Sequence, residues 1–245
     1  MAGLCVGDGL RAADPTVGPH VTALTPLVVP QGFVGTIRLR GSKLKDATGV
    51  RTSASTVPAT LEIKEKKEAA VPPGLDATQA GDSEVIIDLV LGPDFPIGPL
   101  PLAVAVGEQT AEPVVLGVRA AGGVTAETEP NNGFRGAMKI DPERSVTGVI
   151  NAPRDVDVFE VSALAGRKIR ASVTAREVAS LLDPLLTAYD AAGNRLAGAD
   201  DAGSSRDAVL ELTPAVDGPI FLVIQDAFDG GSDGHSYFLE FHLMP

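Results

Sequence analysis

Short apolar stretches recur along almost the whole chain, and clusters of Gly, Pro, Asn and Asp separate them. This pattern is typical of β-strands joined by turns. In the most regular stretch, Ile37 and Leu39 share one face of the predicted strand, while Thr36, Arg38 and Arg40 share the other. With 19 Pro and 27 Gly spread over 245 residues, long helices are not expected. The sequence therefore predicts an all-β protein.

The strand pattern divides the chain into two tandem β-sandwiches. Residues 15–119 are predicted to form an immunoglobulin-like sandwich. Residues 120–126 are small and flexible and predict a linker. Residues 127–245 are predicted to form a second antiparallel sandwich of jelly-roll type. The expected strands are Val21–Thr25, Gly35–Arg40, Pro58–Ile63, Glu84–Leu91, Leu100–Val106 and Val114–Val118, then Ala137–Ile140, Val146–Ile150, Val156–Val161, Lys168–Thr174, Leu185–Tyr189, Val209–Thr213, Ile220–Gln225 and Tyr237–His242.

The first 14 residues differ from the rest. They end in small residues before Asp14-Pro15, as an export signal does, but they lack a basic start and a full apolar core. We expect residues 1–14 to be disordered or the remnant of a signal peptide. Cys5 is the only cysteine, which excludes a disulfide within the chain and a cysteine-based metal site. No apolar run reaches 18 residues, so no membrane span is predicted.

The charge of the chain is negative and uneven. The formal net charge is −12, and residues 121–245 carry −9 of it. A nucleic-acid-binding protein should show a basic patch, and no run of residues here supplies one. The acidic excess indicates either a solvated acidic surface or a cation site.

The beginning of the first predicted sandwich has a recognisable pattern. Its residues read Val21-Thr-Ala-Leu24-Thr-Pro26, then Gly32, then Thr36-Ile-Arg-Leu-Arg-Gly41-Ser-Lys-Leu44. This pattern of about 30 residues resembles the opening of IPT/TIG-type immunoglobulin-like domains. At Gly41 we expect a tight turn with a positive φ. The charged run Lys64 to Glu68 is interpreted as a solvated strand end or loop.

The second half resembles a different family over about 115 residues. The ordered motifs are Glu129-Pro-Asn-Asn132, Asp155-Val-Asp157-Val-Phe159, Ala165-Gly166, Leu182-Asp183-Pro-Leu-Leu186, Tyr189-Asp190-Ala-Ala-Gly193, Asp200-Asp201, Asp217-Gly218 and Ser236-Tyr237. This set resembles bacterial pre-peptidase C-terminal (PPC) domains, β-sandwich modules that accompany secreted proteases and other exported proteins. Preceded by an immunoglobulin-like domain, it is similar to extracytoplasmic proteins of planctomycete-type bacteria.

The resemblance implies a non-catalytic, exported module that binds an extracellular polymer or a surface protein. Its location would be secreted, periplasmic or on the cell surface. Two alternatives stay open: a structural spacer or assembly subunit of a cell-surface complex, and an accessory module that acts in trans with a secreted peptidase.

Oxygen-bearing side chains gather at the start of the second half. Asp157 shares a strand face with Phe159 and Val161, which belong in the core, so this acid needs a partner or a cation. Ca²⁺ takes six to eight oxygen ligands, mostly carboxylate and carbonyl. Resemblance to the collagen-binding modules of clostridial collagenases implies calcium here. The candidate ligands are Glu127, Glu129, Asn131, Asn132, Asp155 and Asp157. In the alternative, the same side chains cap turns.

The chain shows no catalytic signature. Its histidines, His20, His235 and His242, occur without a Gly-x-Ser-x-Gly or His-Glu-x-x-His motif. The chain is therefore predicted not to be an enzyme. The oxygen-rich segments Asp200-Asp201 and Gly230 to Gly234 are interpreted as loops.

Overall fold

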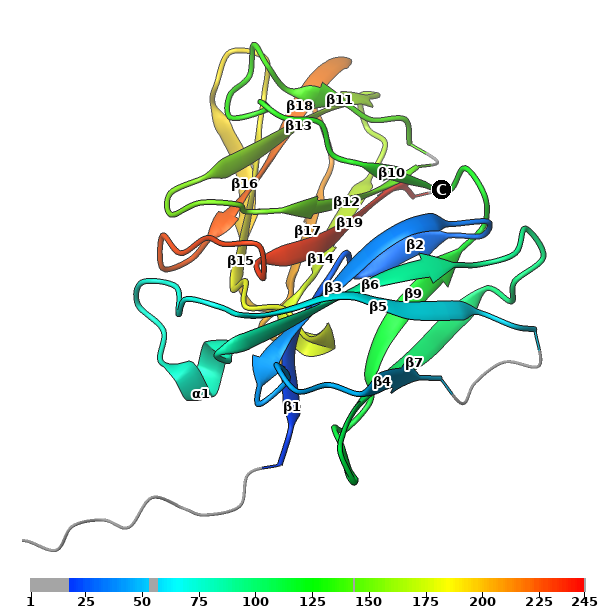
Figure 1. Ribbon diagram of the computed structural model, residues 1–245. Coiled ribbons are helices and arrows are strands. Elements are labelled where there is room, and N and C mark those ends of the chain that lie inside the picture. The colour runs from blue at the N-terminus through cyan, green and yellow to red at the C-terminus, as the bar shows by residue number, and fades with distance from the viewer. Residues whose placement is uncertain (1–17, 53–56, 143, 245) are drawn as a thin grey trace, which may run out of the picture.

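The computed structural model describes residues 18–52, 57–142 and 144–244, and these form two β-sandwiches that pack against each other (Figure 1). The described residues are almost entirely strands and turns, which confirms the all-β prediction. The expectation for residues 1–14 and Cys5 lies outside the described residues.

The first sandwich consists of two antiparallel layers. One sheet has the strand order β1-β3-β6-β5 and the other β2-β9-β7-β4, with β8 beside β7. The pair β2 and β9 is parallel. The strands are β1 (His20–Thr25), β2 (Val28–Pro30), β3 (Val34–Ser42), β4 (Gly49–Arg51), β5 (Thr60–Glu68), β6 (Ser83–Val90), β7 (Gly98–Val106), β8 (Gln109–Thr110) and β9 (Val114–Arg119).

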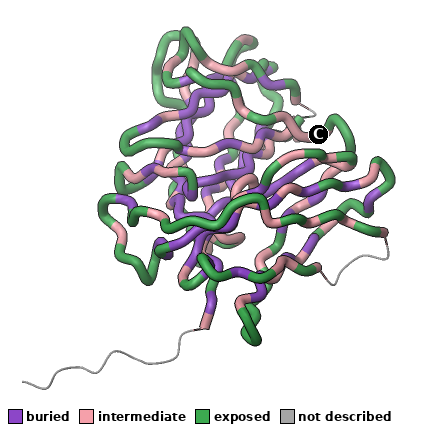
Figure 2. Tube along the Cα trace, viewed as in Figure 1, coloured by how far each residue is buried: buried purple, intermediate pink, exposed green. Residues whose placement is uncertain are grey.

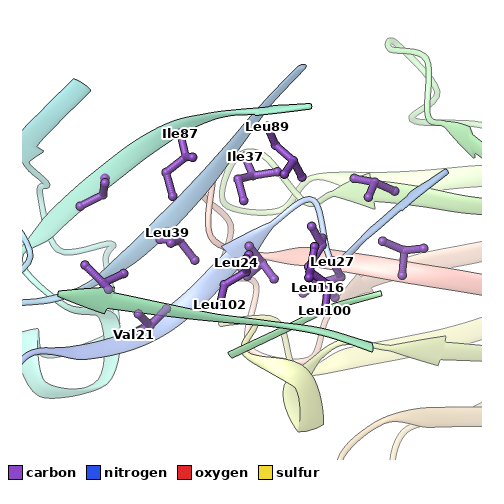
Figure 3. Packing of buried hydrophobic residues seen from close by; sticks show 14 of the residues in the cluster. Val21, Leu24, Leu27, Ile37, Leu39, Ile87, Leu89, Leu100, Leu102 and Leu116 are labelled. Atoms are coloured by element: carbon purple, nitrogen blue, oxygen red, sulfur yellow. The ribbon is translucent and has the colours of Figure 1, made fainter. Parts of the chain in front are cut away.

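Aliphatic side chains fill the space between these two sheets (Figure 3). Ile37 and Leu39 of β3 point inward and are buried, as the alternation predicts, and they meet Leu100 and Leu102 of the opposite sheet. Burial of such side chains, each worth about 1.5–3 kcal/mol, holds the layers together. Buried residues occur along the strands of both sandwiches (Figure 2), and each sandwich has its own main hydrophobic cluster.

The second sandwich also has two sheets. Their strand orders are β10-β12-β19-β14-β17 and β11-β13-β18-β15-β16. Val124–Ala126, within the segment expected as a linker, forms β10 and pairs with β12 in parallel. The strands are β10 (Val124–Ala126), β11 (Met138–Lys139), β12 (Ser145–Val149), β13 (Val156–Ala163), β14 (Ile169–Thr174), β15 (Pro184–Tyr189), β16 (Arg195–Ala199), β17 (Ala208–Leu212), β18 (Gly218–Asp226) and β19 (Ser236–Leu243).

Two local expectations are corrected or completed by the structure. Gly41 does not adopt a positive φ but lies inside β3, where a Cβ would collide with the backbone of His20 and Val21. The prediction of a tight turn was therefore wrong. A glycine is required here because β1 approaches β3 closely. The charged run Lys64 to Glu68 continues β5, the edge strand of its sheet, where alternating charges oppose pairing with another chain.

The described helices are short. Between β5 and β6, α1 (Ala77–Ala80) is capped by Asp76, whose carboxylate accepts from Thr78 N–H and Gln79 N–H. The second helix is the 3₁₀ turn η1 (Arg176–Val178). Neither has the length and apolar character required to cross a membrane.

The two sandwiches share backbone and side-chain contacts. Leu24 N–H of β1 donates to Ala179 O at 2.8 Å, and Ser236 Oγ of β19 donates to Leu24 O at 2.6 Å. Phe238 of β19 packs into the core of the first sandwich, and the Arg119 guanidinium lies 5.2 Å from the centre of its ring. These contacts fix one arrangement of the two sandwiches.

Candidate functional site

The six predicted ligand residues meet at one end of the second sandwich. The segment after β10 brings Glu127 to Asn132, and the start of β13 brings Asp155 and Asp157. Carboxylate oxygens of Glu129, Asp155 and Asp157 all lie within 4.8 Å of one another. We call the six residues the acidic group.

On its inner side the acidic group is joined to the core by Tyr237 of β19. Its hydroxyl lies 2.5 Å from Asp157 Oδ2 and 2.8 Å from Glu127 Oε2, and Val149 N–H donates to Glu127 Oε1 at 2.6 Å. Asp157 is completely buried, as the sequence pattern predicts. Gly148 lies against this contact, where a Cβ would overlap the tyrosine hydroxyl and the Glu127 carboxylate.

In the middle of the group lies the buried side chain of Asn131. Its amide oxygen points at Asp157 Oδ1 and Glu129 Oε2, about 3.1 Å from each, so three oxygens face one another. Such an arrangement is stable in two ways. When the Asn131 amide is rotated by about 180°, its nitrogen faces inward and donates a hydrogen bond to each carboxylate. With the oxygen inward, a cation among the three oxygens removes their repulsion.

On the outer side, Asp155 is held by hydrogen bonds. Its carboxylate accepts from Asn132 Nδ2 at 2.6 Å, from Asn151 N–H at 2.9 Å and from Val156 N–H at 3.0 Å. Asn151 also donates its side-chain nitrogen to Glu129 Oε1 at 3.0 Å. Asn132 thus presents a nitrogen to the group, and its role here is to position Asp155.

Burial and mutual repulsion disturb the titration of these acids. Burial, followed by the charge of Glu127, raises the pKa of Asp157 to about 9. Burial also raises the pKa of Glu127. The pKa of the Tyr237 hydroxyl is raised well above its usual range by burial and by the adjacent carboxylates. Without a cation, the pair Glu127 and Asp157 therefore retains a proton near neutral pH.

The chemistry of the acidic group fits a hard divalent cation. All of the candidate donor atoms are oxygens, and carboxylate oxygens of Glu129, Asp155 and Asp157 lie within 4.8 Å of one another. Burial also disfavours the negative charge of the pair Glu127 and Asp157. Glu129, Asn131, Asp155 and Asp157 are the residues that would hold the ion. Ca²⁺ there would balance the charge of the acids and link the segment after β10 to the start of β13.

Three supporting residues were not predicted from the sequence as parts of this site. These residues are Tyr237, Asn151 and Gly148. They are separated in sequence from residues 127–132 and meet the acidic group only in the folded structure. Strand pairing supplies the connection, because β12 and β19 lie side by side with Gly148 opposite Tyr237. A tyrosine at a core position of the last strand was the available signal, since a buried hydroxyl needs a polar partner.

Two other groups of polar residues are explained by local structure. Carboxylate oxygens of Asp183, Asp200 and Asp201 lie within 4.8 Å of one another, but Arg206 Nη1 lies 3.5 Å from Asp183 Oδ2 and offsets their charge. Ser232 Oγ lies 2.8 Å from His235 Nδ1 within one turn, and the same oxygen accepts from Gly234 N–H. This serine has the contacts of a turn residue.

Comparison with known proteins gives a partial match. No protein-family model matches the chain. A protein of Deinococcus radiodurans named as a probable subtilase-type serine protease is 32% identical over 133 aligned residues. The alignment covers 47% of this chain and 18% of the relative, so the chain spans about a fifth of the length of that curated relative.

Two solved structures match the chain at low sequence identity. The pre-peptidase C-terminal domain of a collagenase from Bacillus anthracis is 14% identical, with 47% of this chain and 99% of that chain covered and a TM-score of 0.36. The secreted serine protease VesC from Vibrio cholerae is 8% identical, with 89% and 48% covered and a TM-score of 0.32.

Proposed function

We propose that the chain is a non-catalytic, exported binding module whose second sandwich is stabilised by calcium bound to the acidic group. The observation that carries the calcium proposal is the convergence of carboxylate oxygens of Glu129, Asp155 and Asp157, which all lie within 4.8 Å of one another. Asp157 is completely buried, and a buried carboxylate is costly unless a proton or a cation compensates it.

The place of a similar sequence within a longer protein supports the binding role. The 133 aligned residues occupy a minor part of a much longer relative that is named as a protease, as expected for a module that accompanies a catalytic domain. The ordered PPC-like motifs from Glu129 to Tyr237 support the same role. An extracytoplasmic location, an extracellular polymer or surface protein as partner, and the IPT/TIG-like and planctomycete-type resemblances belong to this proposal.

Thermal unfolding tests the calcium proposal. A ligand that binds only the folded state stabilises it by about 2.7 kcal/mol at a hundredfold excess over Kd. For a chain of this length, we expect a rise in Tm of about 5–11 °C when calcium replaces chelator. Asp157→Ala should abolish the rise, and Asp94→Asn, which changes an exposed acid of the first sandwich, should keep it. Identical melting curves in calcium and chelator would refute the proposal.

A retention assay separates the proposed binder from the two alternatives. The binder should be retained on insoluble cell-envelope polymers or on collagen-like polymers, whereas a structural spacer should pass through. An accessory acting in trans should instead change the rate at which a secreted peptidase cleaves such a polymer. The assay does not depend on calcium, so the two parts of the proposal can fail separately.

A further inference from the structure

A polar cleft of about 310 Å³ lies between the two sandwiches, away from the acidic group. Leu75 and Gln79, beside and within α1, line it from the first sandwich. Arg176, Asp183 and Arg206 are among the residues that line it from the second. Because both sandwiches contribute walls, the cleft exists only in their observed arrangement.

The inner end of the cleft has an imidazole with a free nitrogen. His235 is 2% exposed, and its Nδ1 lies 2.8 Å from Ser232 Oγ. Among the residues that the structure describes, no group forms a hydrogen bond with its Nε2. Gly230 lines the cleft beside it, and a Cβ at Gly230 would lie 3.1 Å from this nitrogen. The glycine keeps the approach to Nε2 open, so this nitrogen can form a hydrogen bond with a ligand in the cleft.

The charges that line the cleft balance one another. Two arginines, Arg176 and Arg206, face two acids, Asp183 and Asp226. Arg206 already pairs with Asp183 at 3.5 Å. Asp226 is buried and accepts from the N–H groups of Asp183, Gly230 and Phe228, so its carboxylate is satisfied. An ionic ligand of either sign would meet a like charge at short range, which favours a neutral ligand with many hydroxyl groups.

An exposed aromatic ring stands at the entrance of the cleft. Phe228 is 82% exposed, the highest value among the large hydrophobic residues that the structure describes, in a chain with few aromatics. Leu75 supplies apolar surface on the other wall. An apolar ring beside mixed donors and acceptors matches a sugar, whose C–H face packs on an aromatic ring while its hydroxyls form hydrogen bonds.

From these observations we propose that the cleft binds the terminal units of a neutral carbohydrate chain. In this proposal Phe228 contacts the apolar face of the sugar. His235 Nε2 and the guanidinium N–H groups of Arg176 form hydrogen bonds with sugar hydroxyl groups. Gln79 closes the site from the first sandwich. This inference deepens the proposed binding function, since it names the class of polymer.

Ligand-observed NMR and calorimetry test this assignment with the whole chain. The probes are neutral trisaccharides of glucose, mannose, galactose, xylose and N-acetylglucosamine in α and β linkages, each up to 10 mM. Inorganic phosphate and gelatin serve as the anionic and protein comparisons. We expect at least one trisaccharide to bind. Phe228→Ala should weaken it about tenfold, because an aromatic contact contributes about that much. Gln79→Glu, which keeps the oxygen that accepts from Asp76 N–H, should also weaken it.

The matched control is Val216→Ala, which shortens another exposed apolar side chain far along the second sandwich and should leave affinity unchanged. Failure of every trisaccharide to bind would overturn the assignment. Binding that Phe228→Ala and Gln79→Glu leave unaltered, or competition by phosphate or gelatin, would overturn it too. If Phe228→Ala still adheres to an insoluble polymer, the binding module stands and only this site is refuted.

Discussion

Replacing Asp157 with Asn should stabilise the chelator-treated protein while removing its response to calcium. In the native chain, burial and the charge of Glu127 raise the pKa of Asp157 to about 9. An unfolded aspartate has a pKa near 3.9. At pH 7 the folded state must therefore bind a proton that the unfolded state lacks, and this lowers the free energy of unfolding.

The size of the effect follows from proton linkage. About three pH units separate pH 7 from the pKa of the unfolded aspartate, and each contributes 1.36 kcal/mol, which gives an upper bound of about 4 kcal/mol. The asparagine variant needs no proton and keeps an oxygen that can accept from the Tyr237 hydroxyl. We expect it to be about 1–4 kcal/mol more stable than the native chain in chelator.

Urea unfolding in chelator and in millimolar calcium measures both effects. Between pH 4 and pH 9 the contribution of Asp157 should lower the stability of the native chain in chelator as pH rises, relative to the variant, because the folded state holds the extra proton over this range. The variant should lack this contribution. Calcium should stabilise the native chain by about 2.7 kcal/mol at a hundredfold excess over Kd and leave the variant unchanged. A variant that is less stable in chelator yet still responds to calcium would refute the reasoning.

Other side chains around the site and the cleft give further predictions. Gly148→Ala should destabilise the fold by about 1–3 kcal/mol and abolish the calcium response, because its Cβ overlaps the Glu127–Tyr237 contact; thermal unfolding measures both. Tyr237→Phe should lower the free energy of unfolding by about 1–3 kcal/mol, since Glu127 and the buried Asp157 lose the hydroxyl that forms hydrogen bonds with them. Burial lowers the pKa of His235 to about 4, so the contribution of His235 to stability should be lost as pH decreases from about 6.5 to 4, where the unfolded state takes up a proton first. His235→Gln should remove up to about 3 kcal/mol of this pH dependence, and an unchanged pH profile would contradict that origin.

Much of the fold could be predicted because strand patterning is local. Alternation at Ile37 and Leu39 specified the buried face of β3, and the expected strand Leu185–Tyr189 corresponds to β15 in the structure. Gly41 shows where local reasoning fails. A glycine fits both a positive φ and a close approach of two strands, and only the position of β1 distinguishes them.

The site was predictable in part for the same reason. The burial of Asp157 follows from its spacing to Phe159, and both predicted segments do meet. The contribution of Tyr237 depends on the register between β12 and β19, which no short stretch encodes. The cleft at His235 could likewise not be predicted from the sequence. Its walls come from two sandwiches, and its opposite charges come together only in the folded structure.

Calorimetric titration of calcium into chelator-stripped protein tests the central claim most directly. Performed at pH 7 in two buffers of different ionisation enthalpy, it measures both bound calcium and released protons. We predict one ion per chain at the acidic group and release of about one proton, because Asp157 with its pKa of about 9 must ionise to bind. We predict neither binding nor release for Asp157→Asn. Absence of calcium binding by the native chain, or undiminished binding by the variant, would contradict the account.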